Sequence, residues 1–553
     1  MITRLDGPLD LLVIGGGIVG VGVARDAARR GLKVAVVEAN DVASGTSSRS
    51  SKLVHGGLRY LEQYELGLVF ESVSERRVLL DIAPHLVRPL GFLFPVYQGS
   101  RRSKWVIQAG MWLYEGLALF RSPHRPRALQ PSDVEAEEPA LDREGLSGAS
   151  LYWDCHTNDA RLTLETAIDA AQQGAVLATR MRALSLLRES NGHVCGAIVA
   201  DTLSGSLREV RARAVLSATG PWTDQTLALT RPSPRPLLRP TKGVHIVVSA
   251  SKLRVQHAVV CFHPTDGRVL FAIPWRETTY IGTTDTDWSG DPAEVHADAA
   301  DVAYLLAAAA DHFPRNPLTE SDVIATWAGL RPLVAPPEEG VSASATSREH
   351  IVHVELDGLV VVAGGKLTTY RRMAAEAVDT VVRLLRLGGM NTSSLRAART
   401  DEEPLPGAVG WPIDDDGSAL IALVTSAGGL SPATAKLLVE IYGSRAIDVA
   451  RRAAADASAA APWGPDRPEI AAMVDWSIDE ELAVTVEDIL VRRTSVFYHD
   501  AQQGLGVASF VAARMGERLG WDAARVAEEI EAYQVVVAKS RAFRSSATAP
   551  SRQ

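Results

Sequence analysis

The sequence predicts an α/β protein with a second, antiparallel region and an all-α C-terminal domain, and three observations support this. Within residues 10–38 a strand, a glycine-rich turn, a helix and a second strand follow one another. Strand patterns with little helix between them run through residues 238–285, which indicates an antiparallel sheet. From Ser418 to about Phe543 the pattern is almost entirely helical and amphipathic. We therefore expect one α/β region and one antiparallel region, followed by a separate helical domain.

Composition is that of an ordinary globular protein. The chain has 553 residues, of which 46% are hydrophobic and 22% charged, enough for two or three domains. A net charge of −9 gives no reason to expect nucleic-acid binding. Cys155, Cys195 and Cys261 are isolated, which argues against a disulfide framework or a metal site and fits a reducing cytosol. No signal peptide is evident, and no run approaches the roughly 20 apolar residues of a bilayer span.

The first strand–turn–helix unit carries a dinucleotide-binding signature. A short apolar strand is followed at once by Gly15-x-Gly17-x-x-Gly20. Gly15 permits a tight turn, Gly17 lets the backbone approach a pyrophosphate, and Gly20 lets the helix lie close to the sheet. The helix start offers N–H groups and the positive end of its dipole to phosphates. Glu38 ends the second strand, where an acid can bind ribose hydroxyls. The pattern predicts an ADP-containing cofactor without distinguishing FAD from NAD.

The next segment combines a polar loop with a histidine and two glycines. Residues 40–51 are rich in Ser, Thr and Gly, and His55 precedes a Gly-Gly pair that lets a flat ligand approach the main chain. Arg59 and Tyr60 follow immediately. From spacing alone, a solvated arginine and a core tyrosine are as well supported as functional roles.

Residues 88–120 join an apolar strand to a basic and aromatic helix. Arg101, Arg102 and Lys104 precede the strongly apolar segment 105–120, whose single acid is Glu115. Basic residues beside Trp, Tyr and Leu suit a helix that lies in a membrane interface. A buried helix of the second domain, or a dimer contact, explains the same pattern.

Two later glycine turns resemble the first. Residues 217–222 (SATGPW) follow an apolar strand, and residues 358–370 read as a buried strand, a glycine turn and a helix start that carries Lys366 and Thr368. Such a helix start is a second site for a polar ligand. The remaining elements expected in order are mostly connection at 121–148, a strand at 149–155, a helix at 158–173, a meander around 176–215, a helix at 297–313 and a linker at 402–412.

Motifs along essentially the whole chain resemble those of the FAD-dependent, aerobic glycerol-3-phosphate dehydrogenases. The resemblance implies FAD as cofactor and a fold of D-amino-acid-oxidase type, in which a Rossmann-like FAD-binding domain is interleaved with an antiparallel substrate domain and followed by a helical cap. The motifs are SSKLVHGGLRYLE at 50–62, TKGVHIVV at 241–248, IPW at 273–275, TYIGTTDTDW at 279–288, AGLRPL at 328–333, TSREH at 346–350, GGKLTTYRRMAAEA at 364–377 and VEDILVRRTS at 486–495.

The resemblance also implies a division into domains. We expect the FAD-binding domain at 1–80, 150–235 and 330–395, the antiparallel substrate domain at 81–149 and 236–329 with a candidate membrane contact at 101–120, the helical cap at 396–545 and a disordered tail at 546–553.

By resemblance, the substrate pocket is lined by Arg59, Tyr60, Arg331, Arg348 and Lys366. We expect Arg348 and Arg59 to bind a phosphate, because guanidinium groups bind it bidentately. Arg331 and Lys366 are expected nearer the reacting carbon and the flavin, where they stabilise developing negative charge. The expected catalytic residues are Arg331, Lys366 and His55. The proton acceptor stays open among Lys366, His55, His245 and water, and His55 is expected against the isoalloxazine.

The expected cofactor contacts come from the glycine turns and the polar loop, and no metal is expected. They are Gly15, Gly17, Gly20, Glu38, Ala39, Thr46, Ser47, Ser48, Lys52, Leu53, His55, Gly56, Gly57, Ala218, Gly220, Gly365, Lys366, Leu367 and Thr368.

The activity implied by the resemblance is oxidation of sn-glycerol 3-phosphate to dihydroxyacetone phosphate. The hydride from C2 is expected to pass to FAD and the electrons to a quinone, menaquinone or ubiquinone, at the inner face of the cytoplasmic membrane, with a homodimer as a candidate assembly. The alternative is an oxidase that reduces oxygen to hydrogen peroxide. A non-enzymatic flavin-binding protein would need an inert pocket, whereas all the expected arginines are present.

Overall fold

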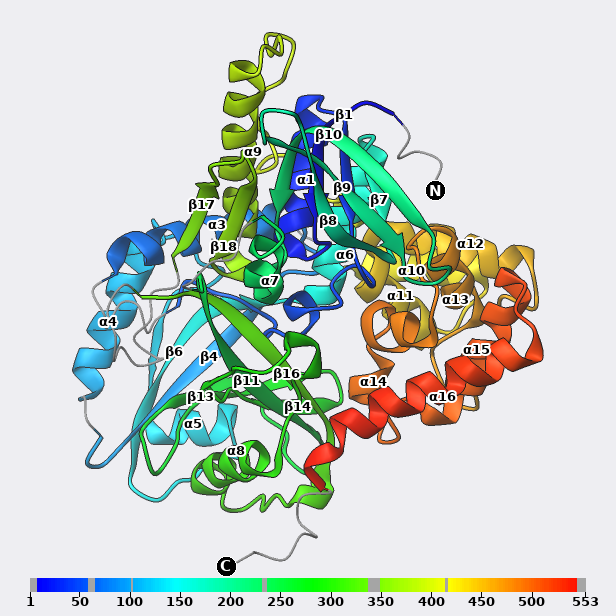
Figure 1. Cartoon of the computed structure of the whole chain (residues 1–553). Coiled ribbons are helices and arrows are strands. Elements are labelled where there is room, and N and C mark those ends of the chain that lie inside the picture. Colours follow the sequence, from blue (N-terminus) through cyan, green and yellow to red (C-terminus); the bar gives the residue numbers. More distant parts are fainter. Residues whose placement is uncertain are drawn as a thin grey trace, which may run out of the picture.

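Two sheets and a helical domain make up the computed structural model, which describes residues 7–57, 65–100, 103–230, 236–336, 349–412 and 416–544. In Figure 1 the first sheet lies at the top, the second at the lower left, and the helical domain, in yellow to red, at the right. The expected α/β, antiparallel and all-α regions are therefore all present.

The first sheet has a parallel centre. Its main order is β17-β18-β10-β1-β2-β7, and β9 pairs β10 and β8. Leu11 and Val13 of β1 pack towards α1, α6 and α9, while Leu12 and Ile14 face the β8–β9 side, so both faces are buried. The strands are β1 (Leu9–Ile14), β2 (Val34–Val37), β7 (Val176–Ala178), β8 (Met181–Arg188), β9 (Val194–Asp201), β10 (Leu207–Ser217), β17 (His350–Val354) and β18 (Val360–Gly364). The helices are α1 (Ile18–Arg30), α6 (Asp159–Gln172), α7 (Thr223–Leu227) and α9 (Tyr370–Leu387).

The second sheet is mostly antiparallel. Its main order is β15-β11-β14-β13-β12-β4-β6-β3, with β16 paired to β11 and β5 to β6. The strands are β3 (Leu53–Val54), β4 (Arg88–Tyr97), β5 (Arg127–Leu129), β6 (Leu146–His156), β11 (Leu238–Ser249), β12 (Ala258–Phe262), β13 (Val269–Trp275), β14 (Thr278–Gly282), β15 (Thr286–Asp287) and β16 (Val323–Val334). The accompanying helices are α3 (Leu66–Ile82), α4 (Lys104–Leu117), α5 (Pro131–Glu137) and α8 (Ala299–His312).

The strand pairing differs from the predicted domain division in three places. The predicted boundaries at 150 and 330 cut through β6 and β16, which both belong to the second sheet, as does β3 within the predicted segment 1–80. The chain leaves the second sheet after His156 and after Val334. Residues 121–148 are more than connection, because they contain β5 and α5. A strand's own pattern does not tell which sheet pairs with it, so these limits needed the partner strands.

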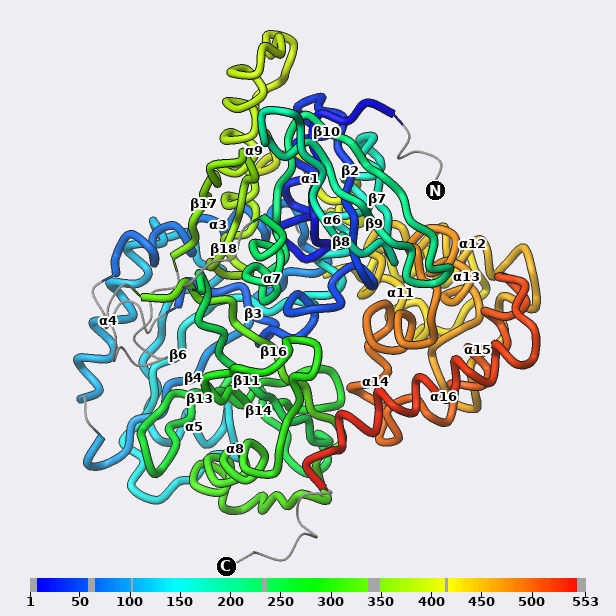
Figure 2. The backbone as a smooth tube through the Cα atoms, in the orientation of Figure 1, coloured from blue at the N-terminus to red at the C-terminus, as the bar shows by residue number. Residues whose placement is uncertain are grey.

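The C-terminal domain is helical as predicted, and its last helix returns to the second sheet. Figure 2 shows this helix, α16, in red, running from the helical domain towards the second sheet. There Ser540 accepts a hydrogen bond from the N–H of Thr326 on β16 at 2.9 Å. The helices are α10 (Ser418–Gly428), α11 (Pro432–Tyr442), α12 (Ala446–Ala455), α13 (Ala471–Asp479), the π-helix η10 (Asp488–Arg493), α14 (Val496–His499), α15 (Leu505–Leu519) and α16 (Ala523–Ser540).

No single helix in the described ranges has the length and apolarity to cross a membrane. One pair, Ser418–Gly428 with Pro432–Ala455, meets those criteria only when taken together and is bent by 117°. The three cysteines are free and buried, as expected of small hydrophobic residues. The predicted tail at 546–553 lies outside the described residues.

Candidate active site

The larger cavity lies where the parallel strands of the first sheet end. Its volume is about 590 Å³, and it is lined by residues that directly follow β1, β2, β10 and β18. This is the edge at which open α/β sheets bind their ligands. Many of the predicted cofactor contacts line this cavity, namely Gly15, Gly17, Glu38, Ala39, Thr46, Ser47, Ala218, Gly220, Gly365, Lys366 and Leu367.

The glycine turn after β1 leaves no room for side chains. Gly15 has a φ of +110°, and a Cβ on it would lie 2.6 Å from the carbonyl oxygen of Ala218. A Cβ on Gly20 would lie 1.9 Å from the carbonyl oxygen of Gly15. Gly17 is the N-cap residue of α1 and lines the cavity. The tight turn predicted at Gly15 and the close helix approach predicted at Gly20 are therefore both present.

Replacing Gly20 by Ala is expected to lower the affinity for the dinucleotide by about tenfold or more, because the added Cβ pushes α1 away from the turn. The measurement is the ratio of flavin absorbance to protein absorbance during dilution. The matched control is Gly110→Ala, where a helical glycine of α4 has open space around it and alanine favours the helix. Equal flavin retention by the two variants would contradict the expected role.

Glu38, which follows β2, also lines this cavity. One of its carboxylate oxygens accepts the N–H of Gly16 at 2.7 Å and the other accepts the N–H of Asn40 at 2.8 Å. Burial raises the pKa of the carboxyl above its ordinary value, although these two N–H groups act to lower it. An ionised carboxylate oxygen offers about two lone pairs, so the oxygen that accepts the Gly16 N–H can still accept a hydroxyl, whereas the other oxygen also accepts the Ser44 hydroxyl at 3.5 Å. This geometry suits the predicted ribose contact.

A smaller cavity of about 160 Å³ adjoins the first, between the two sheets. Thr46, Pro332, Gly365, Lys366 and Leu367 line both cavities. The smaller cavity also brings together further predicted site residues, namely Leu53, His55, Arg331 and Thr368.

Arg331 extends from β16 and is held in a fixed orientation. One terminal guanidinium nitrogen donates to Asp285 at 3.1 Å, and the other donates to the hydroxyl of Thr283 and the carbonyl of Thr284, each at 3.1 Å. Burial alone would raise the pKa of Asp285, but Arg331 and Arg268 together hold it below its ordinary value. The carboxylate is therefore ionised at neutral pH and fixes the guanidinium that lines the smaller cavity.

His245 lies on β11 beside Arg331 in the lining of the smaller cavity. Its ring stacks on Trp327 at 4.6 Å, and its Nε2 lies 3.0 Å from the Ser51 hydroxyl. Its Nδ1 is buried without a hydrogen-bond partner among the described residues. Burial lowers the pKa of His245 well below its usual value of 6.5, and the charges of Arg331 and Lys52 add to this effect. The imidazole is therefore neutral at pH 7.

His55 and Lys366 are anchored by neighbours on different elements. The Thr368 hydroxyl accepts the N–H of His55 and donates to the carbonyl of His55, each at 3.2 Å. The ammonium of Lys366 donates to the Ser72 hydroxyl of α3 at 2.6 Å. Both residues therefore line the smaller cavity, although they come from segments far apart in the sequence.

Five predicted cofactor contacts line neither cavity, namely Gly20, Ser48, Lys52, Gly56 and Gly57. Lys52 is buried, donates to Asp159 at 2.6 Å, and lies 5.3 to 5.4 Å from three aromatic rings. Gly56 donates its N–H to the Tyr114 hydroxyl at 2.8 Å, and a Cβ there would lie 2.3 Å from that oxygen. The sequence showed a polar and flexible loop, but not which of its residues turn inward to pack.

Three predicted substrate residues, Arg59, Tyr60 and Arg348, lie outside the described residues, as do Arg101 and Arg102 of the predicted membrane contact. Sequence reasoning also missed residues that the structure places at the smaller cavity. Arg49, Ser51 and Thr283 line it, and Asp285 fixes Arg331. Thr283 and Asp285 stand in the TYIGTTDTDW motif, which was the available signal.

The two cavities fit FAD. The glycine turn that a Cβ would fill, the carboxylate after β2 and the third glycine turn at Gly364–Gly365 form one continuous lining. The smaller cavity shares Lys366 with this lining but not Glu38. In the described part of the chain, no group of three or more His, Cys, Asp or Glu side chains could hold a metal ion.

Comparisons with known proteins extend over most of the chain. Residues 10–371 match the family of FAD-dependent oxidoreductases, and residues 398–526 match the C-terminal domain of alpha-glycerophosphate oxidase. Glycerol-3-phosphate dehydrogenase 2 of Mycobacterium tuberculosis (strain H37Rv) is 40% identical over 532 residues, which cover 96% of this chain and 88% of that protein. Aerobic glycerol-3-phosphate dehydrogenase of Staphylococcus aureus (strain USA300) is 34% identical over 544 residues, covering 94% and 93%.

Solved structures show the same similarity. The glycerol-3-phosphate dehydrogenase from Bacillus halodurans, complexed with FAD, has a TM-score of 0.80 at 30% identity, covering 98% of this chain and 96% of that one. The L-alpha-glycerophosphate oxidase from Mycoplasma pneumoniae shares the fold alone, with a TM-score of 0.52 at 16% identity and coverage of 69% and 95%.

Proposed function

The chain belongs to the FAD-dependent glycerol-3-phosphate dehydrogenases, and from this premise we propose that it oxidises sn-glycerol 3-phosphate to dihydroxyacetone phosphate. The predicted FAD cofactor and the predicted fold of D-amino-acid-oxidase type with a helical C-terminal domain are both confirmed by that membership. When bound, FAD supplies the acceptor for the hydride that leaves C2 of the substrate.

This proposal depends mainly on the fixed guanidinium of Arg331. It lines a cavity that shares five residues with the dinucleotide cavity, so a small substrate bound there lies next to the cofactor. Because Asp285, Thr283 and Thr284 hold the group in place, it needs no reorganisation when a substrate oxygen gains negative charge. Arg331 thus orients the C2 hydroxyl and stabilises it as its proton leaves.

His245 is the proton acceptor in this proposal. Its imidazole is neutral, and a neutral imidazole has one nitrogen that can accept a proton. Lys366 would first have to lose a proton, and its ammonium already donates to Ser72. Arg348 and Arg59 remain the predicted phosphate ligands, since a dianionic phosphate suits paired guanidinium groups.

Replacing His245 by Asn is expected to lower kcat about 100-fold or more, with little change in KM, because the variant lacks the proton acceptor. The measurement is steady-state turnover with an artificial electron acceptor. The matched control is His263→Asn, which removes another buried imidazole of the second sheet, stacked on Tyr304 and away from both cavities. A similar loss in both variants would contradict the assignment to His245.

The test of the activity itself uses the purified holoenzyme. Under anaerobic conditions, glycerol 3-phosphate is expected to bleach the visible absorbance of the flavin, whereas glycerol at the same concentration is not, since it lacks the phosphate. Failure of glycerol 3-phosphate to bleach the flavin, with dihydroxyacetone phosphate absent from the products, would overturn the proposal.

A quinone in the cytoplasmic membrane is the electron acceptor that we propose, with the protein bound peripherally at the inner face. Support comes from helix α4, which exposes Trp105, Val106, Trp112 and Leu113. Helix α3 packs against α4 and exposes Leu66 and Phe70. Large apolar side chains gathered on one part of a surface favour an interfacial position.

Changing Trp105 and Leu113 together to Ser is expected to reduce sedimentation with anionic liposomes by about tenfold, because each apolar side chain inserted contributes to binding. Turnover with a soluble dye is expected to be unchanged. The control is Leu387→Ser, where an 85% exposed leucine ends α9, which projects at the top of Figure 1 while α4 lies at the left edge. Unchanged sedimentation of the double variant would exclude α4 as the membrane contact.

The oxidase alternative has one observation in its favour, the match of residues 398–526 to the C-terminal domain of alpha-glycerophosphate oxidase. The same reduced holoenzyme distinguishes the two. If menaquinone or ubiquinone analogues reoxidise the reduced flavin quickly and oxygen does so slowly, the result supports a dehydrogenase. Stoichiometric hydrogen peroxide under air would instead identify an oxidase.

A further inference from the structure

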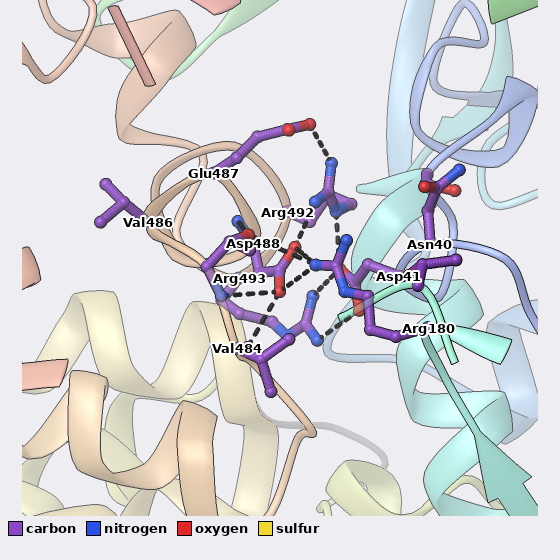
Figure 3. Close-up of polar contacts among 12 residues, drawn as sticks. Asn40, Asp41, Arg180, Val484, Val486, Glu487, Asp488, Arg492 and Arg493 are labelled. Carbon is purple, nitrogen blue, oxygen red and sulfur yellow. Dashed lines mark hydrogen bonds and ion pairs between the residues drawn. The ribbon is translucent and has the colours of Figure 1, made fainter. Parts of the chain in front are cut away.

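The segment from Glu38 to Ser44 separates the cofactor cavity from the helical domain. Glu38, Asn40 and Ser44 line the cavity. Asp41, between them, is 1% exposed and does not line it. Figure 3 shows its carboxylate pointing the other way, towards the arginines of η10. One short segment therefore contacts both the cavity and the C-terminal domain.

Two adjacent arginines of the helical domain hold Asp41. Nε of Arg492 donates to its Oδ2 at 2.6 Å, and the two terminal nitrogens of Arg493 donate to Oδ2 at 2.5 Å and Oδ1 at 2.8 Å. These residues lie 451 and 452 positions after Asp41. All three side chains are buried. Bidentate pairing of this kind fixes orientation as well as distance.

The same π-helix holds the segment from a second side, through Arg180. Asp488 accepts from one terminal nitrogen of Arg180 at 2.7 and 2.8 Å (Figure 3). The backbone N–H of Arg180 donates to the carbonyl of Asn40 at 2.9 Å, and that of Met181 donates to the carbonyl of Glu38 at 2.7 Å. The helical domain thus binds the carboxylate of Asp41 directly and is linked through Arg180 to the backbone of the same segment.

The segment is also tied to the glycine turn. The N–H of Ala43 donates to the carbonyl of Gly16 at 3.1 Å, and the Glu38 carboxylate accepts the N–H of Gly16. A shift of Asp41 would therefore move groups at the ribose and pyrophosphate ends of the cavity together. Buried charges in one connected network strongly disfavour partial separation, because each separated charge loses its partner without regaining water.

We propose that the cluster of Asp41, Arg180, Asp488, Arg492 and Arg493 positions the FAD-binding segment, so that contact with the helical domain determines how long FAD stays bound. None of the five lines the cofactor cavity, so they are positioning residues that act through Glu38 and Asn40. The inference rests on FAD binding in the larger cavity and is independent of the substrate and the electron acceptor proposed above.

The first test measures FAD release from the holoenzyme by the rise of free-flavin fluorescence after dilution. Asp41→Asn is expected to release FAD about 5- to 150-fold faster, the usual range for coupling between two sites. The matched control is Asp475→Asn, which removes another buried carboxylate, bound by Arg514 at 2.7 and 2.9 Å inside the helical domain. Its FAD release is expected to be unchanged. Equal release rates for Asp41→Asn and wild type, or equal acceleration in both variants, would overturn the proposal.

A second measurement needs no variant. Coupling is reciprocal, so bound FAD must stabilise the contact of η10 with Asp41 by the same factor. Hydrogen exchange at the amides of residues 488–493 is therefore expected to be slower in the holoenzyme than after FAD removal, while the amides of α15 stay equally protected. Identical exchange of residues 488–493 with and without FAD would contradict the proposal even if Asp41→Asn failed to fold.

Discussion

Replacing Arg331 by Met is expected to lower kcat for glycerol 3-phosphate about 100- to 1000-fold, the effect of removing one fixed donor to a developing oxyanion. The guanidinium is fixed at three points and lines the cavity beside His245. Because the contact strengthens as charge develops on the substrate oxygen, most of the loss should appear in kcat. The measurement is single-turnover bleaching of the flavin under anaerobic conditions, which separates chemistry from reoxidation.

The control for this result is Arg268→Met. Arg268 binds the same carboxylate, Asp285, at 2.9 Å, but does not line either cavity. Its loss should leave kcat within about tenfold of the wild type, because Arg331 keeps its contacts with Thr283 and Thr284. If both variants lost kcat equally while FAD content stayed normal, the role assigned to Arg331 would be wrong.

Replacing Glu481 by Ala is expected to lower the free energy of unfolding by about 3 kcal/mol, at the lower end of the range for removing one partner of a buried pair. Glu481 accepts both terminal nitrogens of Arg161, at 2.7 and 2.9 Å, and neither side chain has exposed surface. The pair joins α6 to the helical domain. The loss stays at the lower end because Glu165 remains beside Arg161 at 3.3 Å. Urea denaturation of the holoenzyme at fixed FAD concentration measures this change in the free energy of unfolding.

The pH dependence of this effect has a definite sign. Burial alone would raise the pKa of Glu481, but Arg161, Arg445 and Arg493 hold it below the ordinary value of 4.5. A lowered folded-state pKa means that the stabilisation is complete above pH 4.5 and is lost as the pH falls through the lowered value. The difference between wild type and Glu481→Ala should therefore shrink in acid. The control is Glu402→Ala, which removes an exposed ion pair with Arg399 and should leave stability nearly unchanged at every pH, because solvent screens such a pair.

Local patterns predicted much of the fold and part of the site. The glycine turn after β1 and the helix start at Lys366 were read from residues close together in the chain. The cavity residues Arg331 and His55 came from motifs, and the structure places both on one cavity. Such features depend on backbone conformation and near neighbours, which the sequence carries directly.

Other features had no local signal. Lys52 was expected at the cofactor but pairs with Asp159, 107 positions away, among aromatic rings from three other parts of the chain. Gly56 was expected to admit a flat ligand but makes room for Tyr114. The orientation of Arg331 by Asp285 likewise required the alignment of β16 with its neighbours.

The amino-acid sequence by itself determined the succession of α/β, antiparallel and all-α regions, the glycine turn after β1 and the family to which the chain belongs, because these follow from side-chain periodicity, steric limits and motifs. Only the tertiary structure decided which charged residues line a cavity and which are buried as structural pairs. Asp41 and Arg493 show the reason: a carboxylate beside a cofactor loop looks the same in sequence whether it faces the ligand or an arginine 452 positions away. Burial and pairing, which set the energy of a charge, depend on contacts that exist only after folding.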